Sequence, residues 1–273
     1  MADARAARLG WIGAGAIGLP MLARLVAAGH RMTVFDQEPA RSALARNAGA
    51  DPAASPAAVA AASDAVFLCL PDGSAVREAV FGAAACVAGG MGNKLVIDTS
   101  SIDPTLTIDL AAQLARDAGG RWIDAPVSGG VRGATDGTLV ALLGGAPEDV
   151  AAVRDFIACF AHRVVHLGPT GSGQWAKLCN QAIICGTIAL WTEAFALAHA
   201  GNIAPQTLVA ALEGARADSP VREAFGAELA AGRFAPSRNL RKDMANALAR
   251  AREAGQDIPV LSVAARMFTD PER

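Results

Sequence analysis

Hydrophobic and polar positions form a repeating block pattern along the first half of the chain. Short runs of β-branched and aliphatic residues alternate with alanine-rich stretches that are long enough to form helices. This alternation is typical of βαβ units, in which crossover helices join parallel strands. It predicts a doubly wound α/β sheet, with helices at 17–28 and 104–118 and strands at 9–12, 32–35, 65–70, 95–98, 122–124, 139–143 and 164–167.

The pattern changes after Leu167. Gly168-Pro169 and the cluster from Gly171 to Gly173 predict a turn, which is followed by a helix of roughly 25 residues, about 40 Å long. Helices separated by glycine and proline make up the remainder. Because 273 residues exceed the usual size of one hydrophobic core, we predict two domains: an α/β domain at 1–168 and an all-helical domain at 169–273, built on the long helix.

Composition and charge limit the classes of partner. Hydrophobic residues make up 52% of the chain and charged residues 18%, which argues against a disordered protein. A net charge of -2 provides no basic surface for nucleic acid and no polybasic segment for a membrane. The apolar run from Ala182 to Trp191 is shorter than the ~20 residues that span a bilayer, and predicts a buried core helix. The first ten residues lack an apolar targeting segment, so we expect a cytoplasmic protein.

Cysteine and histidine spacing does not indicate a metal site. His162 and His166 lie in a predicted strand, where residues four apart stand about 13 Å from each other. The five cysteines are odd in number and have neither CxxC nor zinc-like spacing, so we predict buried free thiols at Cys69, Cys86, Cys159, Cys179 and Cys185.

A glycine motif, GAGAIG from Gly13 to Gly18, follows the first predicted strand and opens a helix. In that position the first glycine permits a tight turn, the second lets a pyrophosphate approach the backbone, and the third allows close helix packing. An ordinary strand-to-helix turn is the alternative. Asp36, at the end of the second strand, favours NAD over NADP because a carboxylate repels a 2′-phosphate, although Arg41 complicates this. We predict a Rossmann-type domain with cofactor contacts from Gly13, Gly15, Ala16, Ile17, Gly18 and Asp36.

Polar and glycine-rich segments follow three later strands. Ligands gather at the carboxyl ends of parallel strands, so Leu70-Pro71 and the loop containing Ser101 are expected to line the cofactor. The alternative for that loop is helix capping by Ser101 or Asp103. Ser128-Gly129-Gly130 offers a hydroxyl and backbone amides that suit a carboxylate, although a plain glycine turn is also possible.

Lys177 and Asn180 lie three residues apart in the predicted long helix and therefore share a face. Lysine is scarce in this chain: of 24 basic residues only Lys94, Lys177 and Lys242 are lysines. Arginine thus serves wherever a positive charge suffices, whereas a desolvated lysine can give up a proton. Lys177, in an apolar helix, is therefore predicted to be a general acid/base, with a surface lysine as the alternative. Lys242, before Asp243, is favoured more weakly by the same reasoning.

Taken together, these motifs resemble the β-hydroxyacid dehydrogenase family, which includes 3-hydroxyisobutyrate, tartronate semialdehyde and 6-phosphogluconate dehydrogenases. The match covers nearly the whole chain: GxGxxG at Gly13, DxPVSGG at Asp124, GxxxKxxN from Gly173 to Asn180, and the later Lys242-Asp243. Family members usually continue for another helix after the position of Pro259, whereas this chain stops at Arg273.

The resemblance implies NAD-dependent oxidation of a small 3-hydroxy acid, of the 3-hydroxyisobutyrate or glycerate/tartronate semialdehyde type. It also implies a homodimer or homotetramer built through the long helix. An imine reductase of the same fold, or a dinucleotide-binding interaction module without catalysis, is the alternative, and Lys177 argues against both. The implied roles are substrate carboxylate binding by Ser128, Gly129 and Gly130, catalysis by Lys177 and Asn180, and cofactor contacts from Leu70, Pro71, Ser101 and Lys242.

Overall fold

The computed structural model describes residues 7–269 and divides the chain into two compact units, Met1–Lys177 and Leu178–Arg273. The first six residues, part of the segment in which we expected no targeting signal, and the last four lie outside the described part. The units meet inside one long helix, α8 (Ser172–Ala200), and not at a loop. The boundary that we predicted, after residue 168, lies just ahead of this helix.

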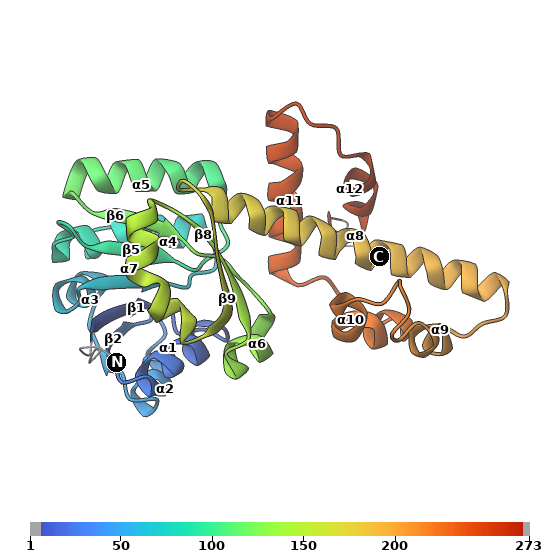
Figure 1. The fold of residues 1–273 in the computed structure, drawn as a ribbon, viewed down its shortest axis with the longest axis horizontal. Coiled ribbons are helices and arrows are strands. Elements are labelled where there is room, and N and C mark those ends of the chain that lie inside the picture. Colours follow the sequence, from blue (N-terminus) through green and yellow to red (C-terminus); the bar gives the residue numbers. More distant parts are fainter. Residues whose placement is uncertain (1–6, 270–273) are drawn as a thin grey trace. The chain divides into compact units, whose positions relative to one another are not determined.

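The first unit is built on a nine-stranded sheet (Figure 1). Its strands are ordered β3-β2-β1-β4-β5-β6-β8-β7, with β9 paired to β8. Strands β1 to β6 are parallel, whereas β8 is antiparallel to β6 and β7. The strands are β1 (Arg8–Ile12), β2 (Arg31–Phe35), β3 (Asp51–Pro52), β4 (Ala65–Leu68), β5 (Leu95–Asp98), β6 (Arg121–Asp124), β7 (Val127–Ser128), β8 (Leu139–Gly144) and β9 (Ala161–Gly168).

All seven predicted strands are present, but the prediction was wrong in three details. The strand at 65–70 ends at Leu68, because the Leu70 N–H donates to Ser100 Oγ, 2.9 Å away, and leaves the ladder. The two-residue strands β3 and β7 were missed, since two residues show no periodicity. The sheet is not wholly parallel, because the connection from β7 to β8 is shorter than the dozen or so residues that a parallel crossover needs.

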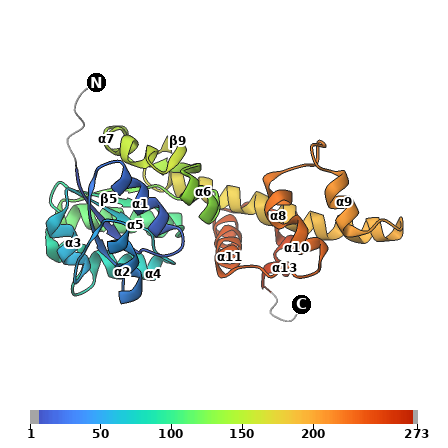
Figure 2. The ribbon, with the colours of Figure 1, turned by 90° about the horizontal axis from the view of Figure 1, so that it is seen from below.

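Helices cover both faces of the sheet, which confirms the doubly wound architecture (Figure 1 and Figure 2). Alternate strand residues face opposite cores: Trp11 and Phe67 pack with α1 and α7, whereas Ile12 and Leu68 pack with α3, α4 and α5. Trp11 and Phe67 stack with ring centroids 5.3 Å apart. The helices are α1 (Gly18–Ala27), α2 (Pro39–Asn47), α3 (Pro56–Ala62), α4 (Gly73–Phe81), the 3₁₀ turn η1 (Cys86–Gly89), α5 (Pro104–Ala118), α6 (Gly130–Asp136) and α7 (Pro147–Ala158).

The second unit is helical, as predicted, and packs around the middle of α8. Cys185, Ile188 and Trp191 of α8 form its core with Met244 and Phe268. Proline occupies the first turn of α9, α10 and α12, where its missing N–H costs little. The helices after α8 are α9 (Pro205–Ala211), α10 (Pro220–Ala230), α11 (Arg238–Glu253), α12 (Pro259–Ala264) and α13 (Arg266–Thr269).

One face of α8 is apolar and open to solvent. Ile183, Leu190 and Leu197, seven residues apart, are 70%, 58% and 77% exposed. The expectation of a buried core helix at 182–191 is therefore wrong for this face, which none of the described residues covers. α8 is long and apolar enough to cross a membrane by length and composition alone, a test that core helices of soluble proteins also pass.

The cysteine prediction was correct in part. All five cysteines, each within the described residues, are free thiols. Cys86 and Cys185 are buried, and burial raises the pKa of each thiol to about 12. Cys179 is exposed, contrary to expectation.

Candidate active site

The glycine turn between β1 and α1 has the geometry of a phosphate cradle. Gly13 has a φ of +97°, and a Cβ there would lie 2.3 Å from the carbonyl oxygen of Cys69. A Cβ at Gly18 would lie 2.2 Å from the Gly13 oxygen. At Gly15 the nearest atom to such a Cβ is Arg41 Nη1, 3.9 Å away, so this backbone is open to a ligand. The turn therefore fits a dinucleotide pyrophosphate.

Asp36 fastens this turn to the end of β2. The side chain is 8% exposed, and its two carboxylate oxygens accept hydrogen bonds from the backbone N–H groups of Ala14 (2.8 Å) and Glu38 (2.9 Å). Arg41 Nη2 lies 3.0 Å from Glu38 Oε1. The guanidinium near the turn is therefore already paired with a carboxylate.

The loops after β4 and β5 are tied together by Ser100. Its Oγ accepts from the Leu70 N–H, while Thr99 Oγ1 donates to the Leu68 carbonyl over 2.6 Å. Asp103 is the residue whose side chain caps α5, with bonds of 2.9 and 3.0 Å from two backbone N–H groups. Pro71 is exposed and Ser101 is half-buried. Our sequence analysis missed Ser100, although it stands beside the predicted Ser101.

The Ser-Gly-Gly segment begins in β7 and turns into α6. Ser128 pairs with Val140 of β8, and Val127 pairs with Ala141. Gly129 and Gly130 have φ values of +133° and +64°, which side chains rarely adopt. Both glycines are exposed, so their backbone is accessible to a ligand.

The start of α8 is held by two buried polar side chains. Asp124, at the end of β6, is 0% exposed and accepts hydrogen bonds from the N–H groups of Gly171 (2.7 Å) and Gln174 (2.9 Å). Burial raises the pKa of Asp124, while these N–H bonds oppose the rise. Gln174, 1% exposed, donates to the Ser100 carbonyl (2.8 Å) and accepts from the Ile102 N–H (3.2 Å).

Neither contact was anticipated from the sequence. Asp124 was interpreted only as the first residue of the DxPVSGG motif, and Gln174 was not singled out. For Asp124 the available signal was a polar residue at the end of a buried strand, because such a residue has to find partners once the strand is packed.

Lys177 and Asn180 lie on α8 with partners in different units. Lys177 is 8% exposed, and its Nζ donates to the Val127 carbonyl over 2.9 Å within the first unit. Asn180 Nδ2 donates to Gln181 Oε1 (3.0 Å), and Gln181 Nε2 donates to Asp243 Oδ2 (2.9 Å) within the second unit. Lys242 Nζ lies 3.7 Å from Asp243 Oδ1. Gln181, 7% exposed, is a polar residue that our sequence analysis did not single out.

The histidine pair is engaged in structural contacts. His162 Nδ1 lies 2.8 Å from the Thr138 carbonyl oxygen and His166 Nε2 lies 3.0 Å from that of Gly145. Because a carbonyl only accepts, both ring nitrogens donate. Within residues 7–269 no group of three or more histidine, cysteine or carboxylate side chains could hold a metal ion.

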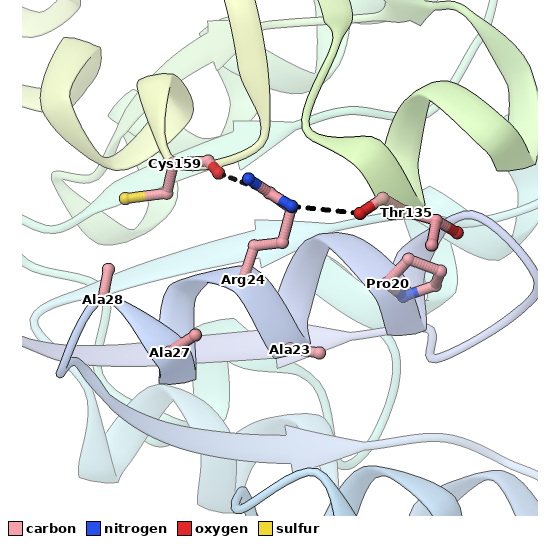
Figure 3. A pocket seen from close by; sticks show the side chains of 7 residues that line it. All are labelled: Pro20, Ala23, Arg24, Ala27, Ala28, Thr135 and Cys159. Atoms are coloured by element: carbon pink, nitrogen blue, oxygen red, sulfur yellow. Dashed lines mark hydrogen bonds between the residues drawn. The ribbon is translucent and has the colours of Figure 1, made fainter.

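A surface hollow of about 450 Å³ lies along the outer side of α1 (Figure 3). Arg24 crosses it, with Nε donating to the Cys159 carbonyl (2.8 Å) and Nη1 donating to the Thr135 carbonyl (3.0 Å). None of the predicted site residues lines this hollow, so it is separate from the candidate site. Its lining residues are Pro20, Ala23, Arg24, Ala27, Ala28, Thr135 and Cys159.

The fold and the site together define a class. A glycine cradle at the start of α1, a carboxylate at the end of β2 and a buried lysine beside a Ser-Gly-Gly segment are the parts of a nicotinamide-dependent oxidoreductase.

Comparisons with known proteins agree with this class. Residues 8–168 match the model for the NAD binding domain of 6-phosphogluconate dehydrogenase. Residues 171–272 match the model for the NAD-binding region of NADP-dependent 3-hydroxyisobutyrate dehydrogenase. The chain therefore belongs to the β-hydroxyacid dehydrogenase family, and is an NAD(P)-dependent oxidoreductase of the 3-hydroxyacid dehydrogenase type.

Individual relatives are similar over most of the chain. The 2-hydroxy-3-oxopropionate reductase of Escherichia coli is 32% identical over 264 residues, 96% of this chain and 90% of that protein. The mitochondrial 3-hydroxyisobutyrate dehydrogenase of Mus musculus is 33% identical over 200 residues, 73% of this chain and 59% of the relative. The structure of Mycobacterium tuberculosis 3-hydroxyisobutyrate dehydrogenase with L-serine has a TM-score of 0.85 at 29% identity, covering 96% and 92% of the two chains.

Imine reductases share the fold alone. The enzyme from Pseudomonas sp. has a TM-score of 0.71 at 18% identity, with 96% of this chain and 92% of that chain covered.

Proposed function

We propose that this protein oxidises a small 3-hydroxy acid with NAD, using Lys177 as the general acid/base. The observation that carries the proposal is the position of Lys177: its ammonium group is 8% exposed and donates to the carbonyl of Val127, the residue before Ser128. A solvated surface lysine would be neither buried nor held there. Burial makes the charged form of a lysine less favourable, which favours exchange of a proton with a substrate.

The substrate class follows from the Ser-Gly-Gly segment and from the relatives. Ser128, Gly129 and Gly130 are proposed to hold a carboxylate through the hydroxyl and the exposed backbone N–H groups. The named relatives act on 2-hydroxy-3-oxopropionate and 3-hydroxyisobutyrate. The substrate motifs have no cluster of lysine or arginine beside them in the sequence, which argues against a phosphorylated acid. We therefore propose 3-hydroxyisobutyrate or glycerate as the first substrates to test.

The reaction is assigned to this chain's own groups as follows. When bound, a nicotinamide cofactor would supply the acceptor for the hydride of the carbinol carbon. Lys177 Nζ takes the hydroxyl proton as the carbonyl forms, and returns it in the reductive direction. Asn180, one helical turn away, orients the reacting oxygen. Lys242 is proposed to contact the cofactor near the nicotinamide, and Leu70, Pro71 and Ser101 to contact it elsewhere.

NAD is the proposed cofactor, in preference to NADP. Asp36 lies at the end of β2 as a carboxylate held by two backbone N–H groups, where it would repel a 2′-phosphate. Arg41, the candidate partner for such a phosphate, is paired with Glu38. The Asp36 carboxylate and the Arg41–Glu38 ion pair therefore both disfavour the extra phosphate.

A homodimer or homotetramer is proposed from the open face of α8. Three large aliphatic residues seven positions apart form a stripe, Ile183, Leu190 and Leu197, that a second copy would cover. We also propose a cytoplasmic location, which the free thiols are compatible with.

The test is a pair of lysine variants assayed with NAD and a panel of 3-hydroxy acids. Lys177→Ala should lower kcat by about 10²–10⁴-fold, the usual contribution of a general acid/base. Lys94→Ala is the matched control, because Lys94 also donates to a backbone carbonyl, that of Ala60 over 2.6 Å, but lies outside the candidate site. If Lys177→Ala lost less than about 10-fold while binding NAD normally, the assignment would be wrong.

A further inference from the structure

The first turn of α8 is held to the sheet by Asp124 and Gln174, two residues to which no substrate or cofactor role has been given above. Asp124 receives the N–H groups of Gly171 and Gln174 through its two different carboxylate oxygens. The Gln174 side chain completes a second pair of bonds, to Ser100 and Ile102 in the loop after β5. All of these groups lie in the first unit and are buried.

Close packing leaves this turn little freedom to move. A Cβ at Gly173 would lie 2.2 Å from the Leu142 carbonyl oxygen and 2.9 Å from Asp124 Oδ2. A Cβ at Gly144 would lie 2.6 Å from Asp124 Oδ1. The helix start and the neighbouring strand therefore both approach the Asp124 carboxylate at distances that only glycine permits.

Lys177 lies one turn beyond Gln174, about 4.5 Å further along the helix axis. Its Nζ donates to Val127, which is three residues after Asp124. One short segment, 124–127, thus holds the helix start through a carboxylate and the lysine through a carbonyl. A rotation or shift of α8 would break the second contact whenever it broke the first.

We propose that Asp124 and Gln174 are positioning residues that set the place of the Lys177 amine in the reaction. This inference rests on the proposed role of Lys177. The cause is geometric: a displacement of about 1 Å in a catalytic group costs on the order of 10²-fold in rate. The Asp124 carboxylate also sits at the N-terminus of α8, where negative charge is favourable.

The first test is Asp124→Asn, which keeps the shape of the side chain but leaves one N–H group of the helix without its carboxylate oxygen. We expect kcat to fall by about 10- to 100-fold. The KM for the hydroxy acid and the Kd for NAD should stay within about 3-fold, because ground-state binding is not changed. A purely structural loss would lower the amount of folded enzyme and leave kcat per folded molecule unchanged.

Asp149→Asn is the matched control. Asp149 is also a buried carboxylate, 5% exposed, and it contacts β6 at its opposite end by pairing with Arg121. Burial raises the pKa of Asp149, as it does that of Asp124. We expect Asp149→Asn to lower Tm while kcat stays within about 2-fold of the original value, because that contact does not lead to Lys177.

Gln174→Met keeps the proposal testable if Asp124→Asn does not fold. Methionine has a similar length but forms neither bond to Ser100 or Ile102, so the same fall in kcat with unchanged KM is expected. Wild-type kcat in either folded variant would overturn the positioning role. If Lys177→Ala itself kept its activity, the proposed function would fail instead, so the two failures are distinguishable.

Discussion

Lys177 and Asn180 lie one turn apart on α8, yet the two compact units hold them in different ways. In the first unit the lysine amine is fixed by a backbone carbonyl, and the helix start by a carboxylate on backbone N–H groups. In the second unit the Asn180 amide donates to the side chain of Gln181, which donates to Asp243. Backbone partners move only with their strand, whereas side-chain partners can change rotamer. The carbonyl that accepts from the amine therefore keeps its place with the sheet.

The largest effect that we expect in the second unit is a weaker oligomer, caused by a substitution on the open face of α8. Leu190→Glu would put a carboxylate into the proposed interface from each copy, and a symmetric contact counts every substitution twice. We expect the apparent dimer Kd to rise by more than about 100-fold, as measured by light scattering across a dilution series.

Leu44→Glu is the control for that experiment. Leu44 is 52% exposed, close to the 58% of Leu190, but lies on α2 of the first unit. Its substitution should leave the oligomer intact. An unchanged oligomeric state in Leu190→Glu would contradict the proposed interface.

The corresponding effect in the first unit is a change in the preference for NAD over NADP. Asp36→Ser removes the carboxylate that is expected to accept from ribose hydroxyls and repel a 2′-phosphate. Loss of a charged hydrogen bond costs about 1.5–3 kcal/mol, so the ratio of kcat/KM for NAD over NADP should fall by about 10- to 100-fold. Asp64→Asn, which alters an exposed aspartate paired with Arg8, should not change the ratio. A ratio unaffected by Asp36→Ser would contradict the NAD preference.

A smaller effect should follow from breaking the series of side-chain hydrogen bonds in the second unit, from Asn180 through Gln181 to Asp243. Asp243→Leu removes the acceptor of Gln181, the side chain to which the Asn180 amide donates. We expect kcat/KM for the hydroxy acid to fall by about 10-fold, with the Kd for NAD within about 3-fold. Glu253→Gln, at the far end of α11, is the control. A loss equal to that of Lys177→Ala would show that the two residues are not held separately.

The smallest effect concerns the dependence of stability on pH, where Asp124 of the first unit and Asp218 of the second unit differ in sign. Burial raises the pKa of Asp124 above its unfolded value, so the folded chain binds that proton more tightly. The contribution of Asp124 therefore declines as pH rises from about 4 through the folded pKa. Arg222 and the N–H of Gly214 lower the pKa of Asp218 to about 2, so its contribution is present above about 4 and disappears as pH falls toward 2.

Urea unfolding of Asp124→Asn and Asp218→Asn between pH 3 and 7 tests this pair. Relative to that of the parent, the free energy of unfolding of Asp124→Asn should increase with rising pH, and that of Asp218→Asn should decrease. If the free energy of unfolding changed with pH in the same direction in both variants, the difference between the two aspartates would be refuted.

Much of the fold could be predicted from the sequence because buried parallel strands and long helices have strong periodicity. The strand at 95–98 and the helix at 104–118 have the predicted bounds. The two-residue strand at Val127–Ser128 could not be predicted, since its pairing depends on β8 and not on local pattern. The open face of α8 was missed for a related reason: sequence shows that Leu190 is apolar, but not whether anything covers it.

The candidate site shows the same distinction between features set by local sequence and features set by distant contacts. Gly13 and Gly18 were predictable because a local turn requires them, and the structure explains each by a close backbone contact. The Asp124 bonds to Gly171 and Gln174 span about fifty positions of sequence, so no spacing rule indicates them. The roles of Lys177, Asn180 and Ser128 remain predictions.

The most direct test of the central claim is a single-turnover measurement on Lys177→Ala saturated with NAD and hydroxy acid, following the reduced cofactor. Hydride transfer should be slower than in the parent and in Lys94→Ala by at least about 100-fold. A rate within about 10-fold of the parent would contradict the claim that the buried amine of Lys177 exchanges the hydroxyl proton.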